Sequence, residues 1–376
     1  MRSRGVDLEV LITGGTGYVG GQCSISLLEN GYDIVLYDNF STGRHRVVDV
    51  LKNLGYDGKV RGVVDSDIKN VDELNSVFEN YEVDAVMHFA ALSLVVESMA
   101  DPALYYCNNV SGTIGLLEAM RAHHKDKIVF SSTAAVYGEP VYTPLDENHP
   151  LNPINPYGRS KLMVERIMDD YDKAYGLRSV RLRYFNVAGA DSKNRLGEWH
   201  DPETHLIPNV LRSTMNSHKP FSLFGNDHDT RDGTCIRDYV NIEDLAEAHV
   251  LALRYLTDGG KTDFFNLGTK RGSTVKEVYE SCKRITGTEI QMEIKGRRAG
   301  DPTSLVANSS KAERILGWVP KRSLDDSICT AYEWEKKKHS LIGEYRTDFS
   351  FHDSISSVRF TLYGFFSLAL ATNPDV

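Results

Sequence analysis

Residues 11–20 read Leu11-Ile12-Thr13-Gly14-Gly15-Thr16-Gly17-Tyr18-Val19-Gly20. A β-prone run ends at Thr13 and a helix-like pattern follows, so Gly14, Gly17 and Gly20 fall in a strand-to-helix turn. There the first glycine allows a tight reversal, the second lets backbone approach a pyrophosphate, and the third lets the helix pack closely. The N–H groups of the helix start, including Tyr18 and Val19, then face the phosphates. The segment predicts a dinucleotide site.

Strand-like and helix-like patterns alternate through the first half of the chain. β-prone runs occupy residues 9–13, 34–37, 60–64, 85–89, 127–131 and 179–185, and helix-like stretches occupy residues 19–30, 72–80, 102–122 and 157–174. This alternation is typical of βαβ units, and it predicts an α/β fold with a Rossmann-type doubly wound parallel sheet.

The pattern changes near Arg195, where loops lengthen and prolines cluster. We therefore expect residues 1–194 to form an NAD-binding domain and residues 195–340 to form mainly a smaller, mixed α/β substrate-binding domain. Residues 238–256 are expected to return to the first domain. Residues 341–376 form a tail of unknown role.

Composition narrows the class of protein. The chain has 376 residues and a net charge of -9, with no basic block, which argues against nucleic-acid binding. Its five cysteines are scattered and form no metal-binding pair, so we expect a reduced, cytoplasmic protein without zinc. No signal-peptide pattern is visible, and the apolar patch at residues 360–371 is too short to span a membrane.

Acidic residues follow the second and third predicted strands. Asp38 lies 18 residues after Gly20, where a carboxylate accepts hydrogen bonds from a ribose diol and repels a 2′-phosphate. This favours NAD over NADP, although the nearby Arg44 is a weak signal in the other direction. Asp67 and Ile68 are predicted to meet the adenine.

The fourth predicted strand ends in small residues, as backbone lying against a cofactor requires. Phe89, Ala90 and Ala91 are therefore cofactor-site candidates. His88, just before them, is interpreted as a packed strand histidine.

Tyr157 and Lys161 are four residues apart at the start of a predicted helix that follows Asn155-Pro156. Two further Tyr-x-x-x-Lys pairs lie in the C-terminal part, on predicted solvated faces. An ammonium beside the phenol, together with a positive nicotinamide ring, is expected to lower the tyrosine pKa and make Tyr157 a general base.

Three hydroxyl residues, Ser131, Ser132 and Thr133, close the fifth strand. We predict that Thr133 hydrogen-bonds the reacting oxygen. The alternative is a loop of small residues that only ends the strand.

Taken together, these motifs resemble the extended short-chain dehydrogenase/reductase superfamily and, within it, the UDP-glucose 4-epimerase family. The resemblance covers roughly Leu8 to Lys338. Further matching motifs are Asp38-Asn39, Asn108-Asn109-Val110, Arg183-Tyr184-Phe185-Asn186, Arg237-Asp238-Tyr239 and Arg297-Arg298-Ala299-Gly300-Asp301.

The resemblance implies site roles residue by residue. Tyr157 would be the base, Lys161 its partner and a ribose ligand, and Thr133 the hydroxyl helper. Asn109 would contact the nicotinamide side, and Asn39 and Tyr184 would also line the cofactor. The residues implied to hold the UDP moiety are Asn186, His205, Leu206, Phe224, Arg237, Arg298 and Asp301. Arginines there suit a diphosphate, which requires cationic donors. The family also implies a homodimer.

The implied reaction is NAD-dependent inversion at C4 of a UDP-hexose through a 4-keto intermediate, converting UDP-galactose to UDP-glucose. The alternatives are UDP-N-acetylglucosamine 4-epimerase, a dehydratase, a decarboxylase, or a catalytically silent NAD-binding regulator. Dehydratases carry an Asp-Glu pair where this chain has Ala134 and Ala135.

The chain also departs from the family pattern at two positions. Ser93 replaces a lysine near the phosphates, which points to weaker cofactor retention. Leu305 stands where strict UDP-glucose enzymes have tyrosine, which leaves room for N-acetylated sugars.

Overall fold

The computed structural model describes residues 8–215, 220–298 and 302–351, with side chains up to residue 341. The chain divides into two compact units, residues 1–335 and residues 336–376. All contacts described below belong to the first unit.

A seven-stranded parallel sheet forms the centre of this unit. Its strand order is β10-β6-β5-β4-β1-β2-β3. The strands are β1 (Glu9–Thr13), β2 (Asp33–Asp38), β3 (Val60–Asp65), β4 (Val83–His88), β5 (Lys127–Thr133), β6 (Arg178–Tyr184) and β10 (Asp263–Leu267). The predicted doubly wound fold is confirmed. The sequence pattern missed β10, a short edge strand whose apolar run is interrupted by Asn266.

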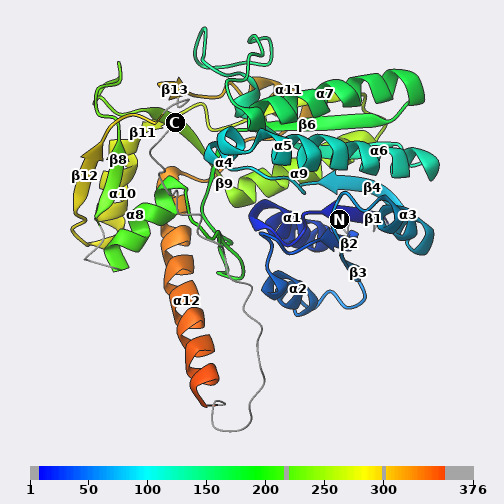
Figure 1. The fold of residues 1–376 in the computed structure, drawn as a ribbon, viewed down its shortest axis with the longest axis horizontal. Coiled ribbons are helices and arrows are strands. Elements are labelled where there is room, and N and C mark those ends of the chain that lie inside the picture. The colour runs from blue at the N-terminus through cyan, green and yellow to red at the C-terminus, as the bar shows by residue number, and fades with distance from the viewer. Residues whose placement is uncertain (1–7, 216–219, 299–301, 352–376) are drawn as a thin grey trace, which may run out of the picture. The chain divides into compact units, whose positions relative to one another are not determined.

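Helices cover both faces of the sheet (Figure 1). On one face lie α1 (Tyr18–Glu29), α2 (His45–Lys52) and α9 (Ile242–Thr257), and α1 packs along α9. The other face carries α3 (Val71–Asn80), α4 (Val95–Ala100), α5 (Pro102–Tyr105), the π-helical turn η1 (Tyr106–Ser111), α6 (Gly112–Ala122) and α7 (Pro156–Tyr175). A short 3₁₀ turn, η2 (Ala134–Val136), follows β5.

Side-chain alternation along the strands divides the apolar core between the two faces. Val10 and Ile12 of β1 join one buried cluster, while Leu11 joins the other. Because both faces are buried, the strands are apolar almost throughout, as expected for a parallel sheet.

Smaller sheets make up the remainder of the unit. One contains β11 (Gly272–Thr274), β9 (Ile236–Asn241) and β13 (Ser304–Leu305), with β7 (Asn186–Ala188) also paired to β9. The other pairs β12 (Met292–Lys295) with β8 (Phe221–Phe224). Helices α8 (Leu206–Met215) and α10 (Val275–Thr286) pack on each other over a separate buried cluster.

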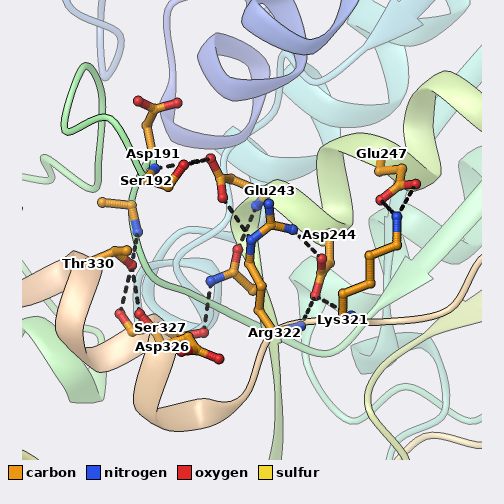
Figure 2. A network of polar contacts seen from close by, with 12 residues as sticks. Asp191, Ser192, Glu243, Asp244, Glu247, Lys321, Arg322, Asp326, Ser327 and Thr330 are labelled. Atoms are coloured by element: carbon orange, nitrogen blue, oxygen red, sulfur yellow. Dashed lines mark hydrogen bonds and ion pairs between the residues drawn. The ribbon is translucent and has the colours of Figure 1, made fainter.

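A polar network ties the segment after α11 (Ser310–Leu316) to the start of α9 (Figure 2). Arg322 pairs with Asp244 at 2.5 Å and with Glu243 at 2.8 Å, and Lys321 pairs with Glu247 at 2.7 Å. Carboxylates in the first turns of α9 also suit its positive end. The network therefore fixes the chain just before α12 (Leu324–Phe351).

Helix α12 crosses from the first unit into the second, whose described part is its segment from residue 336 to residue 351. The predicted apolar patch at 360–371 lies outside the described residues. Among the helices that the structure describes, none is sufficiently long and apolar to cross a membrane.

Candidate active site

The glycine turn adopts the close-packed geometry that its spacing predicts. Gly14 has a φ of +70°, and a Cβ there would lie 2.5 Å from the Ala90 nitrogen. At Gly20 a Cβ would lie 2.2 Å from the Gly14 carbonyl oxygen, so neither position accommodates a side chain. Gly17 caps α1, and the N–H groups of Tyr18 and Val19 precede the first helical hydrogen bond, from Gly21 to Gly17.

Asp38 fastens this turn to the end of β2. Its carboxylate accepts backbone hydrogen bonds of 2.9 Å from Thr16 and from Phe40. Next to it, the Asn39 amide donates to the Asp67 carboxylate at 3.1 Å, and buried Ile68 follows. The structure thus gathers the four residues predicted for the adenosine side at the ends of β2 and β3.

The loop after β4 lies directly on the glycine turn. The Phe89 and Ala90 N–H groups both donate to the Thr13 carbonyl, at 2.8 and 3.0 Å. Ala91 continues this loop toward Leu92. His88 is buried between the Thr13 and Thr113 hydroxyls, and burial, with the Lys161 charge adding to it, lowers its pKa to about 3. It is a packed strand histidine, as interpreted from the sequence.

Asn109 links the loop after β4 to α7 through its side-chain amide. Its amide nitrogen donates to the Leu92 carbonyl at 3.0 Å and to the Ser160 hydroxyl at 3.1 Å. Its oxygen accepts from the Leu92 N–H at 2.9 Å and from the Asn108 amide at 3.1 Å. All four hydrogen-bonding positions of the amide are occupied. This side chain holds the 89–92 loop against α7, and its expected contact with the nicotinamide side of the cofactor stays a prediction.

The start of α7 brings Tyr157 to the end of β5. Asn155 caps the helix by accepting from the Gly158 N–H at 2.8 Å. A Cβ on Gly158 would lie 2.5 Å from the Ala135 carbonyl oxygen, so the first turn packs against η2. The Thr133 hydroxyl accepts from the Ala135 N–H at 3.1 Å and lies near enough to the Tyr157 phenol to lower its pKa. Its hydrogen bond to the reacting oxygen stays a prediction.

Lys161 lies one helical turn further along and is buried. Its Nζ donates to the Ser131 carbonyl at 2.8 Å and lies 4.8 Å from the centre of the Phe130 ring. Burial lowers the pKa of Lys161 to about 7, against the opposing effect of the Glu165 carboxylate.

Burial raises the pKa of the Tyr157 phenol above the ordinary value, and Thr133 only partly opposes this. Lys161 is not among the causes of this pKa shift, and its ammonium donates to the Ser131 carbonyl. The expected lowering by Lys161 together with a positive nicotinamide ring stays a prediction for the NAD-bound protein.

A buried ion pair between Arg183 of β6 and Glu165 of α7 contacts Ser132 near the end of β5, and the sequence analysis did not identify it. The Arg183 guanidinium donates to both Glu165 oxygens and, at 3.1 Å, to the Tyr137 phenol. Ser132 donates to Glu165 at 2.5 Å, and the Ser131 hydroxyl pairs with the Tyr184 phenol. The sequence signal for Glu165 was its spacing of four residues from Lys161, which places both side chains on one face of α7.

The residues predicted for a substrate lie on the smaller sheets. Asn186 begins β7 and is opposite Tyr239 of β9, and Arg237 of β9 is opposite Leu305 of β13. Leu305 packs on the cluster that contains Ala134 and Phe185, so it lies beside the chain that leaves β5.

Phe224 ends β8, and the Arg298 guanidinium lies 3.9 Å from the centre of its ring. Leu206 begins α8. Asp301 lies outside the described residues.

His205 is held by two carboxylates. Its Nδ1 lies 2.5 Å from Glu198 Oε1 and 3.3 Å from Glu203 Oε1. Desolvation acts to lower the pKa of His205, but the carboxylates, Glu198 first, outweigh it and raise the value to about 10. The sequence analysis singled out His205 without these acidic partners, which the Glu-x-His-x-x-Glu-x-His spacing of residues 198–205 would have revealed.

A doubly wound sheet with a Tyr-x-x-x-Lys pair at the start of the helix after β5 defines the class of short-chain dehydrogenases and reductases. The family model described as GDP-mannose 4,6 dehydratase matches residues 11–330. The chain is 48% identical over 330 residues to a UDP-glucose 4-epimerase of Lactobacillus helveticus, covering 88% of this chain and 97% of that protein.

Two solved structures are similar over nearly the same range. The UDP-glucose 4-epimerase from Brucella ovis in complex with NAD superposes with a TM-score of 0.82 at 44% identity, covering 87% of this chain and 98% of that one. The Bifidobacterium longum enzyme in complex with NAD+ and UDP gives a TM-score of 0.83 at 36% identity, covering 88% and 98%. The chain belongs to the UDP-glucose 4-epimerase family.

Proposed function

We propose that this protein is an NAD-dependent epimerase that inverts C4 of a UDP-hexose and interconverts UDP-galactose and UDP-glucose. The observation that carries the proposal is the meeting of three groups at the end of β5. Lys161, one turn after Tyr157 in α7, donates to the Ser131 carbonyl, and the Thr133 hydroxyl lies near enough to the Tyr157 phenol to lower its pKa. Tyrosine, lysine and threonine are all retained, which disfavours a catalytically silent regulator.

The glycine turn fits a dinucleotide. A side chain at Gly14 or Gly20 would fill the space against Ala90 or against the turn itself, and the first N–H groups of α1 are available to phosphate. Asp38 at the end of β2 suits a ribose diol, which supports NAD. When bound, NAD supplies reversible oxidation at C4 of the sugar.

Tyr157 takes the proton from the sugar 4-hydroxyl as C4 is oxidised, and it returns a proton when C4 is reduced from the opposite face. Thr133 donates a hydrogen bond to the same phenol and so stabilises its ionised form. Because burial raises the tyrosine pKa in the protein itself, the phenolate also requires the positive charge of the oxidised nicotinamide. Lys161 would hold the nicotinamide ribose.

Binding energy from the UDP group holds the 4-keto intermediate while the sugar turns. We assign this hold to Asn186, His205, Leu206, Phe224, Arg237 and Arg298, and to Asp301 outside the described residues. The guanidinium groups of Arg237 and Arg298 suit the diphosphate. Leucine at position 305 is smaller than the tyrosine of strict UDP-glucose enzymes, so we propose N-acetylated UDP-sugars as further substrates.

A 4,6-dehydratase is the second candidate, since the matching family model carries that description. After the same oxidation, a dehydratase must remove water from C5 and C6 with an additional acid and base. Ala134 and Ala135 follow Thr133 here, and neither side chain exchanges a proton. We therefore favour the epimerase.

The protein is proposed to act as a cytoplasmic homodimer. Apolar side chains with large exposed fractions gather on neighbouring helices α4, α5, α6 and α7: Val96 at 77%, Met99 at 60%, Leu104 at 39%, Ile114 at 37% and Met163 at 43%. A second copy would cover this surface.

The experiment that tests the function incubates the purified chain with UDP-galactose and resolves the products by NMR. We expect UDP-glucose, and an activity about 10²- to 10⁴-fold lower in Tyr157→Phe. Tyr175→Phe, an exposed position on the same helix, is the matched control. A 4-keto-6-deoxy product would contradict the epimerase assignment. Addition of NAD in a parallel reaction tests whether Ser93 weakens cofactor retention.

A further inference from the structure

Four metal-ligating side chains converge in the loop between β7 and α8. They are Glu198, His200, Glu203 and His205, and one ligand atom from each lies within 4.8 Å of all the others. Within the described residues, no other group of three or more histidine, cysteine and acidic side chains meets this geometry. We propose that this loop binds one divalent transition-metal ion of the Zn²⁺ class. The proposal departs from the expectation of a protein without zinc, which rested on the cysteines alone.

The separations match those around a metal ion. His200 Nδ1 lies 3.1 Å from Glu198 Oε1 and 3.9 Å from Glu203 Oε1, and the corresponding His205 distances are 2.5 and 3.3 Å. A tetrahedral site with bonds of about 2.0–2.1 Å separates its ligand atoms by about 3.3 Å. The four nitrogen–oxygen separations lie on either side of that value.

The donor set selects the class of metal. Two imidazole nitrogens and two carboxylates suit Zn²⁺ and its first-row neighbours, whereas Ca²⁺ and Mg²⁺ prefer oxygen ligands alone. Two carboxylates also balance the double positive charge of the ion.

Glu203 holds its carboxylate in a buried and oriented position. Its side chain is only 1% exposed, and its Oε2 forms an ion pair with Arg212 Nη2 at 3.5 Å. The oxygen that faces the two histidines is Oε1, 3.9 Å from His200 Nδ1 and 3.3 Å from His205 Nδ1. Its Oε1 accepts from the Thr204 and His205 N–H groups, which orient the carboxylate as metal ligands commonly require.

The backbone presents the ligands from anchored positions. Trp334 donates its indole N–H to the Glu198 carbonyl at 2.9 Å, and the Asn209 amide donates to the Glu203 and His205 carbonyls at 3.3 and 2.9 Å. The His205 side chain is 45% exposed, which gives a metal ion access from solvent. A bound ion would fix the loop that leads into α8, directly before Leu206.

The test titrates Zn²⁺ into chelator-treated, full-length protein by calorimetry, with metal content measured after dialysis. We expect one Zn²⁺ per chain, and at least tenfold weaker binding in His200→Ala and in Glu203→Gln. His124→Asn is the matched control, because His124 is an exposed histidine in a left-handed conformation that asparagine also adopts. Its affinity should equal that of the unmodified chain.

Co²⁺ provides a readout that does not depend on the variants folding. Tetrahedral Co²⁺ in the unmodified chain should give an intense visible absorption that one equivalent of Zn²⁺ removes. Absence of stoichiometric Zn²⁺ binding, equal affinity in all four proteins, or the absence of that Co²⁺ band would overturn the proposal.

Discussion

The ammonium of Lys161 donates to the backbone carbonyl of Ser131 across 2.8 Å, so the helix that carries Tyr157 is tied to the strand that carries Thr133. The contact fixes α7 relative to the last residues of β5. The tyrosine and the threonine therefore meet with little freedom, which is the arrangement that proton transfer requires.

Thr133→Val should lower turnover by about one to two orders of magnitude, because the variant removes the donor to the Tyr157 phenol while preserving the side-chain shape. The pH at which turnover rises to its plateau should also increase, since the pKa of the Tyr157 phenol is higher without that donor. The measurement is turnover against pH with UDP-galactose. Thr133→Ser retains the hydroxyl and should stay near the original profile; an equal loss in both variants would contradict the role.

Lys161 should make the stability of the cofactor-free protein depend on pH. Its pKa of about 7 lies below its ordinary value of 10.5, so the unfolded chain binds more protons between these values. Stability from this group therefore rises with pH across that window, by on the order of 1 kcal/mol per pH unit, and is flat below pH 7. Glu165 opposes the shift, and His88 and Tyr157 are the other nearby titratable groups.

Denaturant midpoints between pH 6 and 10 would measure this dependence. Lys161→Met lacks the titrating ammonium. The unfolding free energy of Lys161→Met minus that of the unmodified chain should therefore fall as pH rises. A difference that stays constant across the window would contradict the lowered pKa.

Arg183→Met should destabilise the fold by about 3–5 kcal/mol, since it leaves the buried Glu165 carboxylate without its cation. The double variant Arg183→Met with Glu165→Leu should recover much of that loss, because both charges are then absent. Urea unfolding measures both. Arg121→Ala, in the exposed pair with Glu118, should change stability far less. A double variant as unstable as the single one would argue against charge burial as the cause.

Gly20→Ala should abolish cofactor binding and destabilise the first βα unit. The added methyl group would lie 2.2 Å from the Gly14 carbonyl oxygen, which forces α1 away from the turn. Fluorescence titration with NADH and thermal unfolding measure the two effects. Gly296→Ala is the matched control, because no atom lies within 4 Å of the added methyl group and the residue lies outside the glycine turn. Gly31→Ala would not serve, because Gly31 has a φ of +87°.

Local sequence patterns predicted the fold because each depends on neighbouring residues. The glycine spacing at 14, 17 and 20 and the alternation of apolar runs specify a strand–turn–helix, and repetition of that unit specifies a doubly wound sheet. The pairing of Tyr157 with Lys161 follows in the same way from helical periodicity.

Only the tertiary structure decided which long-range contacts those residues make. Asn109 is fully occupied by Leu92, Ser160 and Asn108, and the Lys161 ammonium is directed at Ser131 rather than at the phenol. Glu165 of α7 meets Arg183 of β6. Strand β10 pairs with residues of β6 that lie 83 positions earlier in the chain, as the pairing of Leu267 with Tyr184 and of Asp263 with Val180 shows.

By itself, then, the sequence determined the architecture and the chemical types of the reacting groups, since both follow from short-range periodicity and turn stereochemistry. Hydrogen-bond partners, burial and the resulting pKa shifts were decided by the tertiary structure, because they depend on which distant segments share a desolvated volume.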